Sequence, residues 1–85
     1  MEKHLILGVH VTDRLQNVPA VQGLLSEYGA YIKTRLGLHN VDASYCSGKG
    51  LVLLEMVGDE TRCRELGQKL AAIDGVEVQS MEFCC

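Results

Sequence analysis

The sequence predicts an α+β domain whose strands and helices follow one another in the order βαββαβ. Alternating or continuous apolar residues predict strands at residues 3–12, 31–38, 50–57 and 76–83. Apolar residues at helical spacing predict helices at residues 17–28 and 60–73. A chain of 85 residues has the size of one small core, so we expect a single domain over residues 1–85.

We predict the first strand at residues 3–12, because apolar side chains occupy every second position there. These side chains are Leu5, Leu7, Val9 and Val11. Gly8 is unusual inside a strand, so we expect a close approach of another backbone or a local bulge there.

We predict the first helix at residues 17–28 from apolar residues at helical spacing. Asn17 can cap it, and Pro19 then lies in the first turn, where its missing N–H group costs nothing. Gly29 directly follows residue 28 and is expected to end the helix. The apolar stripe of this helix consists of Val18, Val21, Leu24, Leu25 and Tyr28.

Residues 31–38 and 50–57 predict the second and third strands, joined by a long polar loop. In the second strand, Gly37 is expected to mark a bulge. Its residues Ile32, Thr34, Leu36 and Leu38 are expected on one face. The third strand is apolar on both faces apart from Glu55, which predicts a central place in the sheet.

Asp59 is expected to cap the second helix, residues 60–73, and Asp74-Gly75 to turn the chain into the last strand. The buried stripe of this helix consists of Cys63, Leu66, Leu70 and Ile73. Its pairs at i,i+4 spacing are Glu60 with Arg64 and Glu65 with Lys69.

Two βα units with right-handed crossovers predict a ferredoxin-like sandwich, with a four-stranded antiparallel sheet and both helices on one face. The other face would carry Ile6, His10 and apolar residues of the third strand, which makes it too apolar for open water. We therefore expect a homodimer or a dimer of dimers whose copies meet through the sheet.

Two stretches of the chain resemble a known family. Residues 31–38, YIKTRLGL, are similar to the second strand of the iron-only hydrogenase system regulator family. Residues 66–78, LGQKLAAIDGVEV, resemble its second helix and last strand through the pattern K-L-x-x-I-x-G-V-x-V. Members of that family are small ACT-like domains, so the resemblance implies an oligomeric regulatory domain with no catalytic residues to carry over.

The same fold occurs in the C-terminal, metal-sensing domain of nickel-responsive repressors. Those proteins carry a ribbon-helix-helix DNA-binding segment in front, whereas this sequence starts directly at the first predicted strand. The formal net charge is −3 and the lysines and arginines are scattered. Because phosphate binding needs clustered cations, we expect no direct contact with nucleic acid.

No apolar run reaches the length of a membrane span, and the start of the sequence lacks the pattern of a secretory signal. We therefore expect a cytoplasmic protein without membrane contact. Its four cysteines, Cys46, Cys63, Cys84 and Cys85, are expected to be thiols in that compartment.

The sequence does not favour an enzyme. A copper chaperone needs Cys-x-x-Cys in the first loop, where residues 12–15 read Thr-Asp-Arg-Leu. An iron–sulfur ferredoxin needs closely spaced cysteines. An acylphosphatase needs an arginine cradle and a catalytic asparagine. Residues 21–23, Val-Gln-Gly, mimic a fragment of its motif, but they fall inside the first predicted helix and no arginine follows them. We expect no catalysis and no required cofactor.

The candidate ligand-binding residues are Thr12, Asp13, Arg14 and Asn17. They combine a hydroxyl, a carboxylate and a guanidinium with the free N–H groups of a helix start, which suit an anion. ACT-like domains often bind amino acids near this loop, so the resemblance favours the same region. The hypothesis is a small anionic metabolite; the alternative is that Asp13 and Asn17 only cap and turn the chain.

His39 and Cys46 flank the long loop and are candidate metal ligands, because imidazole and thiolate suit nickel or zinc. The alternative is that both are ordinary loop residues. The sequence thus predicts a regulatory, ligand-sensing ACT-like domain of an iron-only hydrogenase system, acting through oligomerisation and a protein partner. Two alternatives stay open: a metal-binding sensor or carrier, and an interaction module with no ligand of its own.

Overall fold

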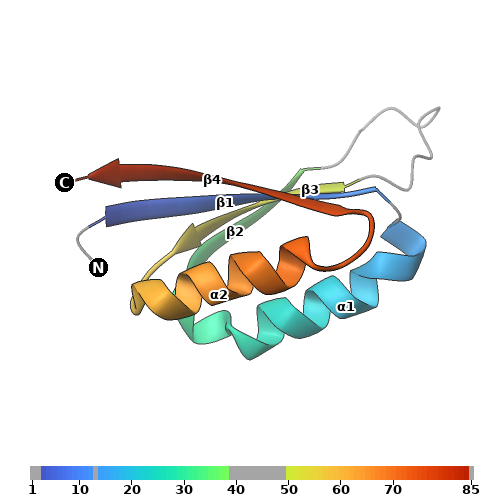
Figure 1. The fold of residues 1–85 in the computed structure, drawn as a ribbon, viewed down its shortest axis with the longest axis horizontal. Coiled ribbons are helices and arrows are strands. Elements are labelled where there is room, and N and C mark those ends of the chain that lie inside the picture. Colours follow the sequence, from blue (N-terminus) through green and yellow to red (C-terminus); the bar gives the residue numbers. More distant parts are fainter. Residues whose placement is uncertain (1–2, 13, 39–49, 85) are drawn as a thin grey trace.

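The computed structural model describes residues 3–12, 14–38 and 50–84 (Figure 1). Its elements follow the predicted order βαββαβ. They are β1 (Lys3–Val11), α1 (Arg14–Glu27), a 3-10 turn (Gly29–Tyr31), β2 (Ile32–Leu38), β3 (Gly50–Met56), α2 (Glu60–Ala71) and β4 (Val76–Cys84).

The strands form one antiparallel sheet in the order β2-β3-β1-β4. Both helices lie side by side on the same face of this sheet (Figure 1). The predicted ferredoxin-like α+β fold is therefore confirmed, and so is the interior place of β3. The edges of the sheet are β2 and β4, and neither of the two described helices lies over the opposite face of the sheet.

The core lies between the sheet and the two helices. Every second side chain of β1 from Leu5 to Val11 is buried, which is the alternation expected of a strand with one covered face. Leu54 of β3 is fully buried against them. The helices contribute Val21 and Leu25 from α1 and Cys63, Leu66 and Leu70 from α2, as their apolar stripes predict, and Tyr28 adds its ring to the core from the turn directly after α1.

The bulge in β2 lies at Lys33 and not at Gly37. The pairing of β2 with β3 shifts between Ile32 and Thr34, whereas Gly37 pairs regularly with Val52. Since one extra residue reverses the faces of a strand, Ile32 turns toward the helices while Thr34 and Leu36 turn to the uncovered side. The prediction of one common face for these residues was wrong at Ile32.

Helix α1 begins at Arg14, three residues earlier than predicted. Asn17 therefore lies within the first turn of α1 and does not precede it as a cap. Pro19 is inside the helix, where its missing N–H group leaves the carbonyl four residues earlier without its helical partner. The Asn-x-Pro spacing favours a helix start at Asn17, but the helix already begins at Arg14.

The start and end of α2 follow local rules. The Asp59 carboxylate accepts a hydrogen bond of 2.9 Å from the backbone N–H of Thr61, which confirms the predicted cap. The helix ends at Ala71, two residues earlier than predicted. Gly75 then takes a φ of 86°, a left-handed conformation that favours glycine, and turns the chain into β4.

Helices α1 and α2 have 14 and 12 residues. Among the described residues, no helix is long and apolar enough to cross a membrane.

Candidate functional site

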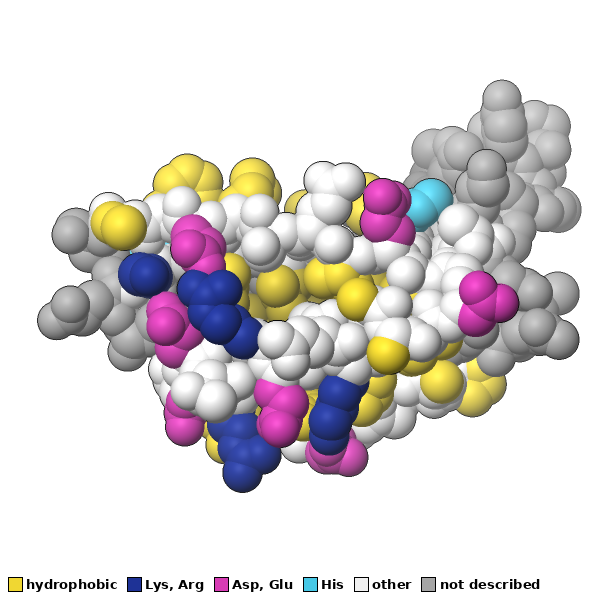
Figure 2. Space-filling view, viewed as in Figure 1, with side chains coloured by type: hydrophobic (Ala, Val, Ile, Leu, Met, Phe, Trp, Pro, Cys, Tyr) yellow, Lys and Arg dark blue, Asp and Glu magenta, His cyan; other side chains and the backbone are white. Residues whose placement is uncertain are grey.

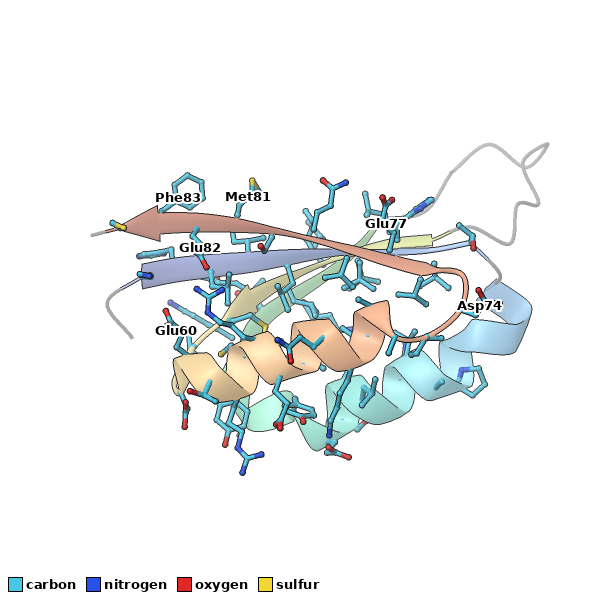
Figure 3. The ribbon with its side chains drawn as sticks, in the orientation of Figure 1. Glu60, Asp74, Glu77, Met81, Glu82 and Phe83 are labelled. Carbon is cyan, nitrogen blue, oxygen red and sulfur yellow. The ribbon has the colours of Figure 1, made fainter. Side chains whose placement is uncertain are left out.

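The face of the sheet that the helices leave uncovered is rich in apolar side chains, and we call it the open sheet face. The strand registers place its apolar members on β1, β2, β3 and β4. They are Ile6, Leu36, Leu51, Leu53, Met81 and Phe83. Figure 3 shows Met81 and Phe83 pointing away from the helices. Leu36, Met81 and Phe83 are more than half exposed, at 52%, 52% and 54%. Exposed apolar side chains that gather on one face are typical of interaction surfaces, so this face is a candidate for one.

A hollow of about 310 Å³ lies in the open sheet face. Its apolar walls come from Ile6, Leu51, Leu53 and Met81, which surround Gly8. A Cβ atom on Gly8 would lie 3.7 Å from Leu53 Cδ2 and 3.8 Å from the carbonyl oxygen of Gln79. These are ordinary van der Waals distances, so a side chain would fit, and its absence opens the hollow.

The polar rim of this hollow is formed by His10 of β1 and by Glu77 and Gln79 of β4. The register places Glu77 directly opposite His10, and Gln79 opposite Gly8. Figure 3 shows Glu77 on the same side of β4 as Met81 and Phe83. Glu77 is exposed and, within the described residues, has no ion-pair partner. As far as the described residues go, the rim therefore offers a carboxylate without an ion-pair partner beside an apolar floor.

A second groove, of about 260 Å³, lies between α2 and β4 on the helix side of the sheet. Figure 2 shows apolar atoms exposed in the gap between these two elements. The guanidinium of Arg64 lines this groove but donates to the carboxylate of Glu82, which points toward α2 (Figure 3). The Arg64 guanidinium also lies 3.7 Å from Glu60. Because these charges pair with one another, the hollow at Gly8 is the stronger candidate site.

The predicted ligand-binding loop is described only in part. Thr12 donates from its hydroxyl to the carbonyl oxygen of Gly75 at 2.7 Å. Asp13 lies outside the described residues, and the side chains of Arg14 and Asn17, in the first turn of α1, do as well. A role for these four residues in binding an anion stays a prediction.

The predicted metal ligands His39 and Cys46 also lie outside the described residues. Within residues 3–12, 14–38 and 50–84, no group of three or more His, Cys, Asp or Glu side chains is placed to hold a metal ion. The metal site stays a prediction of the sequence.

The described cysteines differ in environment. Cys63 is buried in α2, with its Sγ 3.4 Å from the carbonyl oxygen of Val57, as its place on the apolar stripe predicts. Burial, followed by the charges of Asp59 and Glu60, raises the pKa of the Cys63 thiol. A neutral, buried thiol is a packing group and a poor nucleophile. Cys84 is exposed at the end of β4, and Cys85 lies outside the described residues.

Polar and charged groups on the helix surface join the end of α1 and the turn after it to α2. The hydroxyl of Tyr28 donates to the Glu65 carboxylate at 2.8 Å, and Arg62 donates to the same oxygen at 2.9 Å. The hydrogen bond from Tyr28, and then that from Arg62, lowers the pKa of Glu65. Lys69 lies 5.2 Å from the centre of the Tyr28 ring and 3.5 Å from Glu27. These contacts fix the helix pair on the side of the molecule away from the open sheet face.

The sequence marked Gly8 as unusual inside a strand, but it did not reveal the hollow around it. The glycine was expected to admit another backbone or to form a bulge, and β1 pairs with both neighbours without a register shift. The signal that could have led to the hollow is a glycine at a position where the alternation of β1 puts Ile6 and His10 on the uncovered face. The contributions of Glu77 and Gln79 depend on the pairing of β4 with β1.

No family model matches the sequence, and no curated protein matches it significantly. Solved structures do. The chain is similar to an uncharacterised protein from Thermotoga maritima, with 26% identity, 96% of this chain and 99% of that chain covered, and a TM-score of 0.82.

Two structures of more distant sequence share the architecture. The ACT domain of a GTP pyrophosphokinase from Chlorobium tepidum is 19% identical, with 95% of this chain and 89% of that chain covered and a TM-score of 0.66. A PII-like signalling protein from Thermus thermophilus is 10% identical, with coverages of 98% and 89% and a TM-score of 0.65. The fold is thus that of ACT and PII-like domains.

Proposed function

We propose that this chain is a small regulatory domain that senses a ligand and works as a homodimer or a dimer of dimers joined through the open sheet face. The observation that carries the proposal is the uncovered apolar face, with its hollow, on a fold shared with ACT and PII-like domains. An apolar face of this extent is stabilised when a second surface removes it from water.

The dimensions of the open sheet face suit such an interface. The nine residues of β1 span about 30 Å at the usual rise of a strand, and four strands span about 19 Å. One copy would thus contribute about 500–600 Å², and two copies about 1,100 Å² in total, which passes the lower limit of about 1,000 Å² for a specific interface.

We further propose that the regulated process is an iron-only hydrogenase system. The support is the resemblance of residues 31–38 and 66–78 to that regulator family. The proposal assigns no catalytic step to the chain. Regulation would pass through a protein partner and not through DNA, because the net charge is −3 and the described cations are scattered: Arg62, Arg64 and Lys69 lie beside glutamates on α2, and Lys33 and Arg35 lie on β2.

The proposal is tested by deleting the gene in its source organism and measuring iron-only hydrogenase transcripts and activity. We expect both to change, and the wild-type gene to restore them. Ile6→Glu, which places a charge on the open sheet face, should fail to restore them, whereas Gln22→Glu, which adds the same charge on the exposed side of α1, should succeed. Unchanged hydrogenase levels in the deletion strain would contradict the hydrogenase link.

A further inference from the structure

The hollow at Gly8 has the size and lining of a small-molecule site. Its volume of about 310 Å³ lies at the lower end of the range of ligand pockets, about 300–1,000 Å³. It is large enough for one ring with a short side chain. Protein interfaces pack as densely as protein interiors, so an empty space of this size beneath a covering copy would be unfavourable.

The charge at the rim sets the kind of ligand. Among the side chains that line the hollow, Glu77 is acidic and His10 is the other titratable group. No ion pair or hydrogen bond joins the two within the described part of the chain, although their strands place them opposite each other. A carboxylate repels an anion, and it attracts a protonated nitrogen that can donate hydrogen bonds to it.

Assembly would strengthen this preference. When a second copy covers the open sheet face, the Glu77 carboxylate loses water, and a charge without a partner is costly in such surroundings. A cation bound in the hollow removes that cost. A ligand of this kind would therefore favour the assembled state.

We propose that the hollow binds a small amine, whose apolar body lies against Ile6, Leu53 and Met81 over Gly8 and whose protonated nitrogen pairs with Glu77. The proposal rests on the ligand-sensing function proposed above and names the class of ligand. It differs from the anion expected at the loop after β1 in both place and charge.

The test uses isothermal titration of the full chain with three probes. Phenethylamine carries both a ring and a protonated amine, 3-phenylpropanoate carries the same ring with a carboxylate, and ethylamine carries the charge without the ring. We expect phenethylamine to bind at least about tenfold more tightly than either of the other two, since it satisfies both the apolar floor and the carboxylate.

Four variants locate the binding. Gly8→Val places three carbon atoms on the floor of the hollow, at a position where a Cβ has room, and it should strongly weaken phenethylamine binding. Gly37→Val, in a strand of the same sheet but outside the hollow, should leave binding unchanged. Glu77→Gln should weaken binding about tenfold. Glu55→Gln, which lies on the open sheet face but outside the hollow, should leave phenethylamine binding unchanged.

Three outcomes would overturn the inference. They are equal binding of 3-phenylpropanoate, unchanged binding to folded Gly8→Val, and no phenethylamine binding at millimolar concentration. Light scattering on the same samples separates this inference from the proposed function. An assembled protein that ignores phenethylamine would refute the ligand class alone, whereas a monomer would refute the assembly.

Discussion

Thr12 donates two hydrogen bonds to one acceptor, the carbonyl oxygen of Gly75. The backbone N–H of Thr12 lies 2.8 Å from this oxygen and the side-chain hydroxyl 2.7 Å. The pair joins the end of β1 to the turn that leads into β4. It thereby helps to fix the edge strand that carries Glu77 and Met81 beside the hollow.

Thr12→Val should destabilise the protein by about 0.5–1.5 kcal/mol, because it removes the hydroxyl hydrogen bond and keeps the shape of the side chain. The measurement is urea unfolding at a fixed protein concentration. Thr61→Val, at an exposed position in α2, is the control and should change the midpoint less. An unchanged midpoint for Thr12→Val would show that the hydroxyl contributes nothing.

Gly8→Ala should stabilise the fold by about 0.5–1 kcal/mol, because glycine inside a strand has an entropic cost and the added methyl group meets Leu53 at an ordinary distance of 3.7 Å. Thermal unfolding of the two proteins measures the difference. A clear loss of stability would mean that the backbone at Gly8 needs a glycine. A gain would mean that the hollow is kept at a cost in stability.

The order of elements could be predicted because it depends on local periodicity. Alternation placed β1, and helical spacing placed the buried stripes of α1 and α2. The cap at Asp59 and the turn at Gly75 also follow from local chemistry. The bulge at Lys33 could not be predicted, because it depends on how β2 pairs with β3. The residues of either strand alone do not show that register.

The candidate site was less predictable than the fold. The hollow is formed by residues of β1, β3 and β4, so no single segment carries its pattern. Side-chain partners were likewise set by packing between elements. Glu65 was expected to pair with Lys69, but it accepts from Tyr28 and Arg62, while Lys69 lies near Glu27 of the other helix.

Tyr28→Phe should destabilise the protein near neutral pH, and this loss of stability should become smaller in acid. The hydrogen bonds to Glu65 from Tyr28 and Arg62 lower the pKa of Glu65 in the folded state. A lowered carboxylate pKa stabilises the fold fully above the unfolded-state value of about 4.3, and this stabilisation is lost as the pH falls through the folded-state value.

The difference in stability between wild type and Tyr28→Phe should therefore narrow as the pH falls from about 5 to about 3. Urea midpoints across this range measure it. Tyr31→Phe, whose ring lies 6.3 Å from that of Tyr28, is the control. A difference that stays constant with pH would contradict the role given to the Glu65 carboxylate.

The protein should not bind DNA by itself. Binding through phosphates needs several clustered cations, and Arg62, Arg64 and Lys69 are held by glutamates on the helix surface. A gel-shift titration with an iron-only hydrogenase promoter should show no complex at submicromolar protein. A complex that weakens steeply with salt would show that direct DNA binding had been wrongly excluded.

The central claim is that copies of this chain assemble through the open sheet face, and the molar mass in solution tests it most directly. Light scattering at micromolar concentration should give the mass of two or four chains for the wild type and for Gln22→Glu. Ile6→Glu and Phe83→Glu should give the mass of one folded chain, because each places a carboxylate in the apolar contact. A wild-type mass of one chain, or an assembly that survives both substitutions on the open sheet face, would contradict the account.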